Sequence, residues 1–449
     1  MKITVQTGLG EITGTAERGC RVFLGVPYAR AGRFEYAVPV DSWDGPLSAT
    51  DFGPSCPQKR QKYEHLENPE RLFYYREFRE GQTYRYSEDC LNLNIYAPED
   101  AQGCPVVVFV HGGGFDSGCN AESPFRGYGL ASRGVVAVFI NYRVGALGYL
   151  THADILKACG RDGNFGLDDI RTAVLWVKNH IADFGGDPDR ITLCGQSAGA
   201  IQIQYLCLDH RNEGLFARAV MMSGGGMFPK FALPKYASDT RDYWREMMRA
   251  AGCSTLEELR ALDLSALSDA MEQMRLTRKD NTYNVMPVVD GRLLPLPVPE
   301  LIGNPLKVDY MIGYTANDLY APVMAHIGNR FGCANGAFLY FFDMPAPGDD
   351  NGAFHSSDLR YMFEELGTSW RPFGARDREV SREMADYLAS FARTGDPNGP
   401  GLPAWERAGK KSPRAMCFAK KATQMGRAPM LRLVRNMLKG GPKAKESGA

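Results

Sequence analysis

A serine flanked by glycines is the first feature of the sequence that could do covalent chemistry. Residues 195–199 read Gly-Gln-Ser-Ala-Gly, after the strand-like run 191–194 and before the helical run 200–208. In a G-x-S-x-G pattern a sharp strand-to-helix turn exposes the serine hydroxyl, and glycine is needed where the backbones approach closely. Chance also produces the pattern, so its position between strand and helix carries the prediction that Ser197 is a nucleophile.

A glycine-rich loop is the second such feature. Residues 111–115 read His-Gly-Gly-Gly-Phe and directly follow the apolar run 106–110. Two backbone N–H groups of this loop, with the N–H of Ala198, could stabilise the oxyanion of an acyl-transfer reaction. The alternative is an ordinary glycine turn that packs a strand against a helix. Its pairing with the serine turn favours the oxyanion hole.

A serine nucleophile requires a histidine base and a carboxylate that orients it. In α/β-hydrolases the chain order is serine, acid, histidine. Only three of the seven histidines follow Ser197, namely His210, His326 and His355. The first is too near the serine in sequence, and the second follows the best acid candidate too closely. His355, on a loop-like stretch, is the predicted base, although a lone loop histidine is more often a surface residue.

Three aspartates compete for the role of the acid. Asp318 follows the strand-like run 308–313, whereas Asp290 lies in a predicted turn and Asp309 inside the strand. We prefer Asp318 because a triad needs a loop carboxylate.

The elements that position these residues are strands alternating with helices. The strand-like runs are 105–110, 135–141, 190–194, 216–222 and 308–313, and apolar residues at steps of three and four indicate a helix over 167–184. Apolar strands without alternation predict an α/β fold, with a central, mostly parallel β-sheet flanked by helices on both faces. Ligands bind such sheets at the carboxyl ends of the strands, where the candidate residues lie.

Length and composition describe a globular chain. We expect one domain over residues 1–440, a frayed, Lys- and Arg-rich stretch from about Lys410, and a flexible basic tail over 441–449. The 52 Lys and Arg residues balance 52 Asp and Glu residues, which argues against nucleic acid as a partner. No apolar run is long enough to span a membrane, so no membrane partner is expected.

The eleven cysteines are typical of free thiols rather than a disulfide framework. With no apolar leader at the N-terminus, the expected location is the cytoplasm, or outside the cell if a leader has been removed. No motif indicates a metal or an organic cofactor. The expected partner is a small-molecule ester substrate, and the sequence does not predict the oligomeric state.

Further segments extend the pattern along most of the chain. They are Gly-Val-Pro-Tyr-Ala at 25–29, Ser-Glu-Asp-Cys-Leu-Asn-Leu-Asn at 87–94, Asn-Tyr-Arg-Val-Gly-Ala-Leu-Gly at 141–148, Gly-Asn-Phe-Gly-Leu-Asp at 163–168, Ala-Phe-His at 353–355 and Thr-Gly-Asp-Pro-Asn at 394–398. With the serine turn and the glycine loop, they resemble the type-B carboxylesterases, an α/β-hydrolase family that includes cholinesterases and bacterial para-nitrobenzyl esterases.

The resemblance implies a role for each matching residue. Ser197 would be the nucleophile, Asp318 the acid and His355 the base. The oxyanion donors would be Gly113, Gly114 and Ala198. A supporting network would include Gln196 and Ser223, and the substrate pocket would include Phe115, Leu319 and Tyr320.

The chain departs from the family pattern at several positions. Gln196 stands where the family usually has Glu, which removes a buried negative charge. The triad acid is more often Glu, and the glycine that usually follows it is here Leu319. Because Asp is one methylene shorter, the Asp318 loop must approach His355 more closely. The segment after Tyr28 is trimmed, which favours a more open pocket.

Cys56 and Cys90 match positions that secreted relatives join as a disulfide, and they would stay thiols in a reducing cytoplasm. Between them lies an aromatic-rich stretch with Phe73, Tyr74, Tyr75, Phe78, Tyr84 and Tyr86. By resemblance it could line the gorge entrance. Packing of a surface loop explains it equally well.

The predicted function is hydrolysis of small uncharged carboxylic esters through an acyl-enzyme. Lipase, thioesterase, amidase or acyltransferase chemistry at the same site is an alternative, because pocket shape sets the substrate. A non-catalytic, cholinesterase-like binding module is the other alternative.

Overall fold

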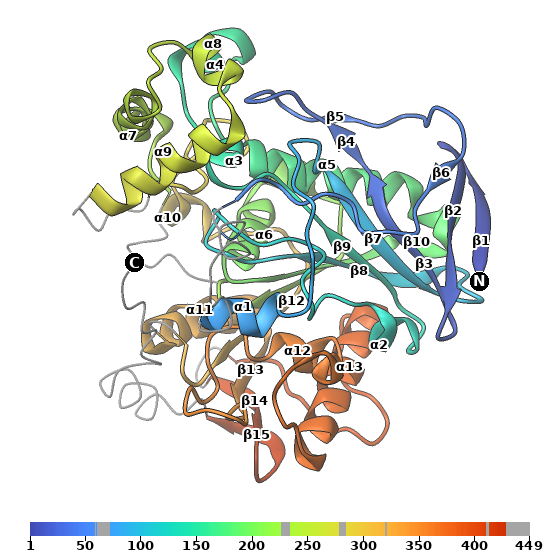
Figure 1. The fold of residues 1–449 in the computed structure, drawn as a ribbon. Helices are drawn as coiled ribbons and strands as arrows, with labels where there is room; N and C mark the ends of the chain where they lie inside the picture. The colour runs from blue at the N-terminus through green and yellow to red at the C-terminus, as the bar shows by residue number, and fades with distance from the viewer. Residues whose placement is uncertain are drawn as a thin grey trace.

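The computed structural model describes residues 1–58, 60, 72–225, 234–277, 284–318, 321–409 and 413–427. These residues form a twisted 13-stranded sheet (Figure 1). Along its main path the strands lie in the order β1-β2-β3-β7-β9-β8-β10-β11-β12-β13-β14-β15, and β6 pairs with β2. The short strands β4 and β5 form a separate ribbon. One sheet thus runs from β1 to β15, and the bounds of a single domain over residues 1–440 stay a prediction.

The bounds of the elements are as follows. The strands are β1 (Lys2–Thr7), β2 (Gly10–Glu17), β3 (Cys20–Pro27), β4 (Ala29–Arg30), β5 (Val38–Pro39), β6 (Leu47–Ser48), β7 (Asn92–Pro98), β8 (Cys104–Val110), β9 (Val136–Ile140), β10 (Gly186–Gln196), β11 (Arg218–Met222), β12 (Asp309–Thr315), β13 (Phe338–Asp343), β14 (Arg414–Ala419) and β15 (Thr423–Arg427). The helices are α1 (Phe73–Phe78), α2 (Tyr128–Ala131), α3 (Gly145–Tyr149), α4 (Ala153–Cys159), α5 (Phe165–His180), α6 (Ala198–Leu208), α7 (Ala237–Ala250), α8 (Leu256–Ala261), α9 (Leu264–Thr277), α10 (Val298–Leu301), α11 (Ala321–Asn335), α12 (Leu359–Met362) and α13 (Ala375–Thr394).

The centre of the sheet is parallel, as predicted. Strands β9, β8, β10, β11, β12, β13 and β14 pair in parallel, and antiparallel pairs occur toward the two edges. Every residue of β9 and β11 is buried. Strands covered on both faces carry apolar side chains on both, which is why they appear in the sequence as continuous apolar runs.

Helices cover both faces of this sheet, with α5 and α6 on one side and α12 and α13 on the other (Figure 1). The predicted helix over 167–184 is confirmed in its main part by α5, and its last turn, Ile181–Phe184, is a 3₁₀ helix. The chain then leaves the helix at Gly185, whose φ of +85° favours glycine. Within the described residues, no helix is both long and apolar enough to cross a membrane.

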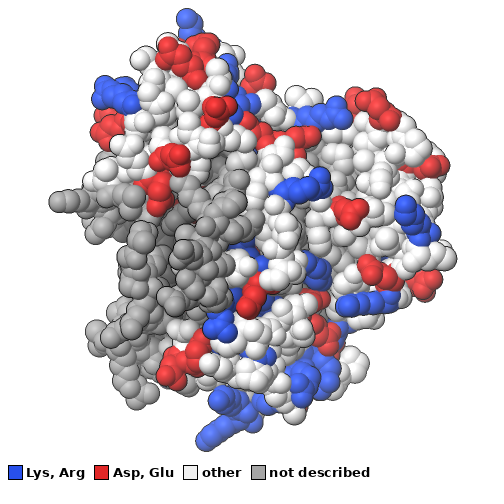
Figure 2. Space-filling model, viewed as in Figure 1, with Lys and Arg blue, Asp and Glu red and all other residues white. Residues whose placement is uncertain are grey.

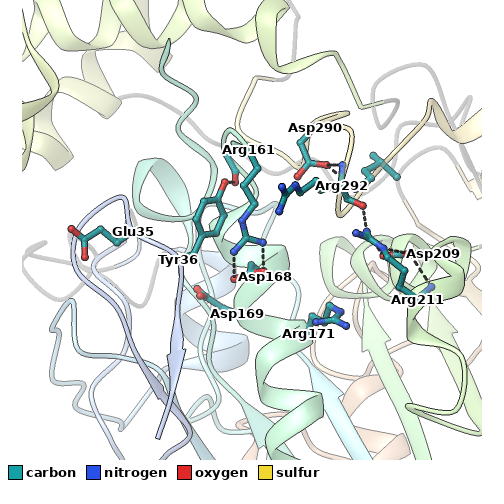
Figure 3. Close-up of polar contacts among 12 residues, drawn as sticks. Glu35, Tyr36, Arg161, Asp168, Asp169, Arg171, Asp209, Arg211, Asp290 and Arg292 are labelled. Atoms are coloured by element: carbon teal, nitrogen blue, oxygen red, sulfur yellow. Dashed lines mark hydrogen bonds and ion pairs between the residues drawn. The ribbon is translucent and has the colours of Figure 1, made fainter. Parts of the chain in front are cut away.

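Polar contacts fasten the N-terminal segment to the start of α5. The guanidinium of Arg161 lies over the Tyr36 ring, 3.4 Å from its centroid, and pairs with Asp168 at 2.7 Å (Figure 3). The Tyr36 hydroxyl donates to the carbonyl of Gly163 at 2.9 Å. Segments more than a hundred residues apart are thereby held together beside the sheet.

The sequence-based prediction for the C-terminal stretch was wrong over part of its length. We expected a frayed stretch from about Lys410, but β14 and β15 extend the sheet there. Ala415, Met416 and Phe418 are buried, and β14 pairs in parallel with β13. The basic residues that suggested a solvated tail flank these short apolar segments. The predicted tail over 441–449 lies outside the described residues.

Charged side chains are distributed as the balanced composition predicts. On the face shown in Figure 2, acidic and basic side chains are interspersed over the described part of the surface. The local arrangement of charges around the candidate site therefore matters more than a whole-molecule field.

Candidate active site

The predicted nucleophile lies on a strained turn between β10 and α6. Ser197 has φ +54° and ψ −124°, and its N–H donates to the carbonyl of Met222 at 2.8 Å. A Cβ on Gly199 would lie 2.2 Å from the carbonyl oxygen of Val110, and one on Gly224 would lie 2.3 Å from that of Ser197. Neighbouring backbones therefore hold Ser197 in a backbone conformation that residues other than glycine rarely adopt.

His355 and Asp318 are brought together from separate loops, as predicted. The imidazole Nδ1 of His355 lies 2.6 Å from Oδ1 of Asp318. The Asp318 side chain is fully buried, and that of His355 is 17% exposed. Because an ionised carboxylate can only accept, the neutral histidine carries its proton on Nδ1 and leaves Nε2 as an acceptor.

The charge around His355 favours its protonated form. Burial lowers the pKa of His355, but the negative charges of Asp318 and, further away, Asp358 outweigh it and raise the pKa above its ordinary value of 6.5. This histidine therefore gives up its proton at a higher pH than a solvated one.

A backbone contact explains how the short aspartate reaches the histidine. Asn317, directly before Asp318, donates its N–H to the carbonyl of Ala353 at 2.9 Å. Its Oδ1 accepts from the N–H of Ala353 at 3.1 Å. A Cβ on Gly352 would lie 2.5 Å from the same oxygen. The two loops are therefore joined two residues before His355.

The other imidazole nitrogen faces the nucleophile turn. Nε2 of His355 lies 3.2 Å from the amide nitrogen of Gln196, which also donates to Oγ of Ser356 at 3.1 Å. Between these two described segments, no hydrogen bond joins Oγ of Ser197 to His355. Catalytic hydrogen bonds are often loose until substrate binds. His355 thus lies beside the residue that precedes Ser197.

The glycine loop after β8 lies against this turn. Gly113 and Gly114 have φ of +117° and +65°, and a Cβ on Gly113 would lie 2.1 Å from the carbonyl oxygen of Ser117. A Cβ on Gly112 would lie 3.0 Å from Cβ of Ser197. Ala198 is the first residue of α6, so its N–H has no acceptor within the helix. The loop therefore lies against the serine turn, and the oxyanion role of Gly113, Gly114 and Ala198 stays a prediction.

His111, the first residue of the loop motif, has a structural role. Its ring stacks on Tyr142 with centroids 4.4 Å apart, and the Tyr142 hydroxyl donates to the His111 carbonyl at 2.8 Å. Burial lowers the pKa of His111 to about 4. This histidine therefore stays neutral near pH 7 and holds the loop in place.

A second buried carboxylate, for which the sequence predicted no role, lies behind His355. Asp358 is fully buried, and its Oδ2 accepts from the Tyr340 hydroxyl at 2.8 Å. Burial, with a further contribution from the charge of Asp318, raises the pKa of Asp358 to about 6. Its position three residues after the predicted base was the available signal. Asn317, next to the predicted acid, was missed in the same way.

Two predicted supporting and pocket residues occupy buried positions near the site. Oγ of Ser223 is buried and has no hydrogen-bond partner among the described residues, so its network role stays a prediction. Phe115 has φ +65° and packs edge-on against Tyr149, with ring centroids 5.6 Å apart. Its contact with substrate also stays a prediction. Leu319 and Tyr320 lie outside the described residues.

The alternative acids have structural partners elsewhere. Asp309 pairs with Arg407 at 2.7 Å. Oδ1 of Asp290 accepts from the N–H groups of Arg292 and Leu294, within its own turn (Figure 3 shows the first). Neither is the carboxylate that contacts His355.

The cysteines and aromatic residues that precede the glycine loop are divided between the site and the core. Cys56 and Cys90 are buried thiols, and the hydrogen bond between them, followed by burial, raises the pKa of Cys90. Phe73 packs edge-on against Phe354, with centroids 4.8 Å apart, next to the base. Tyr84 instead is buried in a small cluster with Cys119 and Ala121.

The described residues hold no group of three or more His, Cys, Asp or Glu side chains that could bind a metal ion.

The serine turn, glycine loop and histidine–aspartate pair at the carboxyl end of a parallel sheet define the class of α/β-hydrolases. Comparisons with known proteins agree with this class. A model of the carboxylesterase family matches residues 1–331 and 319–434. Para-nitrobenzyl esterase of Bacillus subtilis is 32% identical over 463 residues, covering 88% of this chain and 90% of that protein. Bile salt-activated lipase of Rattus norvegicus is 29% identical, covering 84% and 73%.

Solved structures show the same fold. A PNB esterase has a TM-score of 0.81 at 24% identity, covering 96% of this chain and 99% of its own. The chain belongs to the carboxylesterase family and is a carboxylic ester hydrolase.

Proposed function

We propose that this protein hydrolyses small uncharged carboxylic esters with Ser197 as nucleophile, His355 as base and Asp318 as the acid that orients it. The observation that carries the proposal is the 2.6 Å contact between His355 Nδ1 and Asp318 Oδ1, with Nε2 of the same ring beside the nucleophile turn. A neutral imidazole held in this tautomer is the form that can take a serine proton.

In the proposed first step, Oγ of Ser197 attacks the ester carbonyl carbon while Nε2 of His355 accepts its proton. The N–H groups of Gly113, Gly114 and Ala198 stabilise the resulting oxyanion. The imidazolium then gives its proton to the departing alcohol oxygen, and an acyl-enzyme remains. Water, deprotonated by the same nitrogen, attacks the acyl carbon, and collapse of this second intermediate releases the acid and restores the serine.

The preference for uncharged esters rests on the charges near the nucleophile. Gln196 supplies a neutral amide beside Ser197, and the carboxylates Asp318 and Asp358 are buried behind His355. The described residues assigned to the acyl site include no Lys or Arg side chain. A cation there would be needed to bind a negatively charged acyl group.

The test is hydrolysis of p-nitrophenyl esters from acetate to long acyl chains, with Ser197→Ala and His355→Ala beside the parent. We expect the parent to prefer short chains and both variants to lose kcat by about 10³-fold or more while keeping the parent's thermal unfolding. Full activity in either variant would remove that residue from the mechanism. A preference for long chains would favour a lipase.

Covalent labelling checks the nucleophile independently of turnover. A fluorophosphonate should add to the peptide that contains Ser197, as read by mass spectrometry, and should not label Ser197→Ala. A folded parent that does not react would contradict the proposed nucleophile.

A further inference from the structure

Gln196 stands directly before Ser197, where the family usually has a glutamate, and its amide contacts His355. Its amide nitrogen lies 3.2 Å from Nε2 of His355 and 3.1 Å from Oγ of Ser356. Gln196 is 2% exposed, at the end of β10. The contact is part-buried, between the buried Gln196 and a His355 side chain that is 17% exposed. A hydrogen bond shielded from bulk water in this way is electrostatically stronger than one in water.

The hydrogen-bonding partners of His355 determine which end of the amide faces it. Asp318 accepts from Nδ1, so Nε2 of the neutral ring has no proton and needs a donor. Of the two ends of the amide, only the NH₂ group donates. The carbonyl Oε1 then lies toward Gly112, where a Cβ would approach it to 2.6 Å. The absence of a side chain at Gly112 makes room for this orientation.

The titratable groups around His355 come from three parts of the chain. Asp318 follows β12, Asp358 lies on the histidine's own loop, and Tyr340 of β13 donates to Asp358. The two carboxylates favour the imidazolium. A donor on Nε2 has the opposite effect, because it can bind only the neutral ring.

We propose that Gln196 is a positioning residue: in the free enzyme its NH₂ group donates to Nε2 and stabilises the neutral form of His355, against the two carboxylates that favour the imidazolium, and the Ser197 hydroxyl replaces it at Nε2 when substrate binds. This inference rests on the proposed function of His355. It also explains the effect of having Gln where the family usually has Glu. A glutamate here would be a third carboxylate that favours the imidazolium of His355, whereas the amide favours the neutral ring.

Gln196→Glu and Gln196→Met test the inference through the pH dependence of kcat/KM. The carboxylate should move the acid limb upward by about 1 pH unit or more, which lowers kcat/KM at pH 6 about tenfold or more. Methionine has a similar size but no donor, and should move the limb in the same direction by less. Gln202→Glu is the matched control, because Gln202 is buried in the next helix and contacts Tyr149; it should leave the limb in place.

A spectroscopic titration separates this inference from the proposed function. With ¹⁵N-labelled histidine, the seven imidazoles are resolved by NMR, and His355→Ala identifies the signal of His355. In a Ser197→Ala background its pKa should rise in Gln196→Glu and, by less, in Gln196→Met. An unchanged or lower pKa in both variants would overturn the role of Gln196. An inactive parent with the expected NMR shifts would instead contradict the proposed function alone. If Gln196→Glu does not fold, Gln196→Met decides.

Discussion

The side-chain oxygen of Asn317 accepts a hydrogen bond from the N–H of Ala353, 36 residues further along the chain. This contact joins the loop that carries the proposed acid to the loop that carries the proposed base. The 2.6 Å distance between Asp318 and His355 depends on the same two loops.

Asn317→Ala should therefore reduce catalysis without unfolding the protein. Loss of the bond frees the Asp318 loop to move away from His355, and a displacement of about 1 Å can lower the rate on the order of 10²-fold. We expect kcat/KM to fall by about 10- to 100-fold. Asn351→Ala is the matched control, because Asn351 contacts Asp349 in the same region and should keep the parent rate. Equal rates in both variants would show that the contact does not position the triad.

Asp318→Asn should cost far more than substitution of either rival acid. An amide facing Nδ1 can favour the wrong tautomer of His355. The same substitution in a serine-protease triad lowers kcat about 10⁴-fold. Steady-state kinetics should give a loss of about 10³-fold or more for Asp318→Asn, and little change for Asp309→Asn. A silent Asp318→Asn would mean that another carboxylate orients the base.

Gly113→Ala should damage the proposed oxyanion hole. The added Cβ would lie 2.1 Å from the Ser117 carbonyl oxygen, so the loop has to move, and loss of one oxyanion donor lowers kcat by about 10²- to 10³-fold. Gly134→Ala also adds a Cβ at a positive φ, +72°, with no atom near the added Cβ. This control should remain active. A Gly113→Ala enzyme with normal kcat would place the donors elsewhere.

Asp358→Asn should move the acid limb of the pH profile to lower pH. The charge of Asp358 raises the pKa of His355, so its removal makes the neutral base available at a lower pH. The kcat/KM profile between pH 5 and pH 8 measures the shift. An upward or absent shift would contradict the assigned electrostatic role.

The same variant should change how stability depends on pH. The pKa of Asp358 is raised in the folded protein to about 6, so the native state binds this proton more tightly than the unfolded state. The contribution of the group to the free energy of unfolding then falls as the pH rises from about 4 to about 6. Urea titrations across this range should show a smaller decline in Asp358→Asn than in the parent.

The sequence alone predicted the parallel sheet and named Ser197 and His355 as the candidate nucleophile and base. Continuous apolar runs gave the buried parallel strands, because residues covered on both faces need no alternation. Ser197 and the glycine loop were recognisable because each motif is local, and His355 followed by elimination among few histidines. Short strands with mixed flanks, such as β14, gave too weak a local signal and were missed.

Only the tertiary structure decided which groups surround His355. Asn317 lies next to Asp318 in sequence, yet its contact with Ala353 exists only because β12 and β13 are neighbours in the sheet. Tyr340 meets Asp358, and Gln196 meets His355, across 18 and 159 residues. Hydrogen bonds and charge effects depend on distances of a few ångströms, and for residues this far apart in the chain folding alone sets those distances.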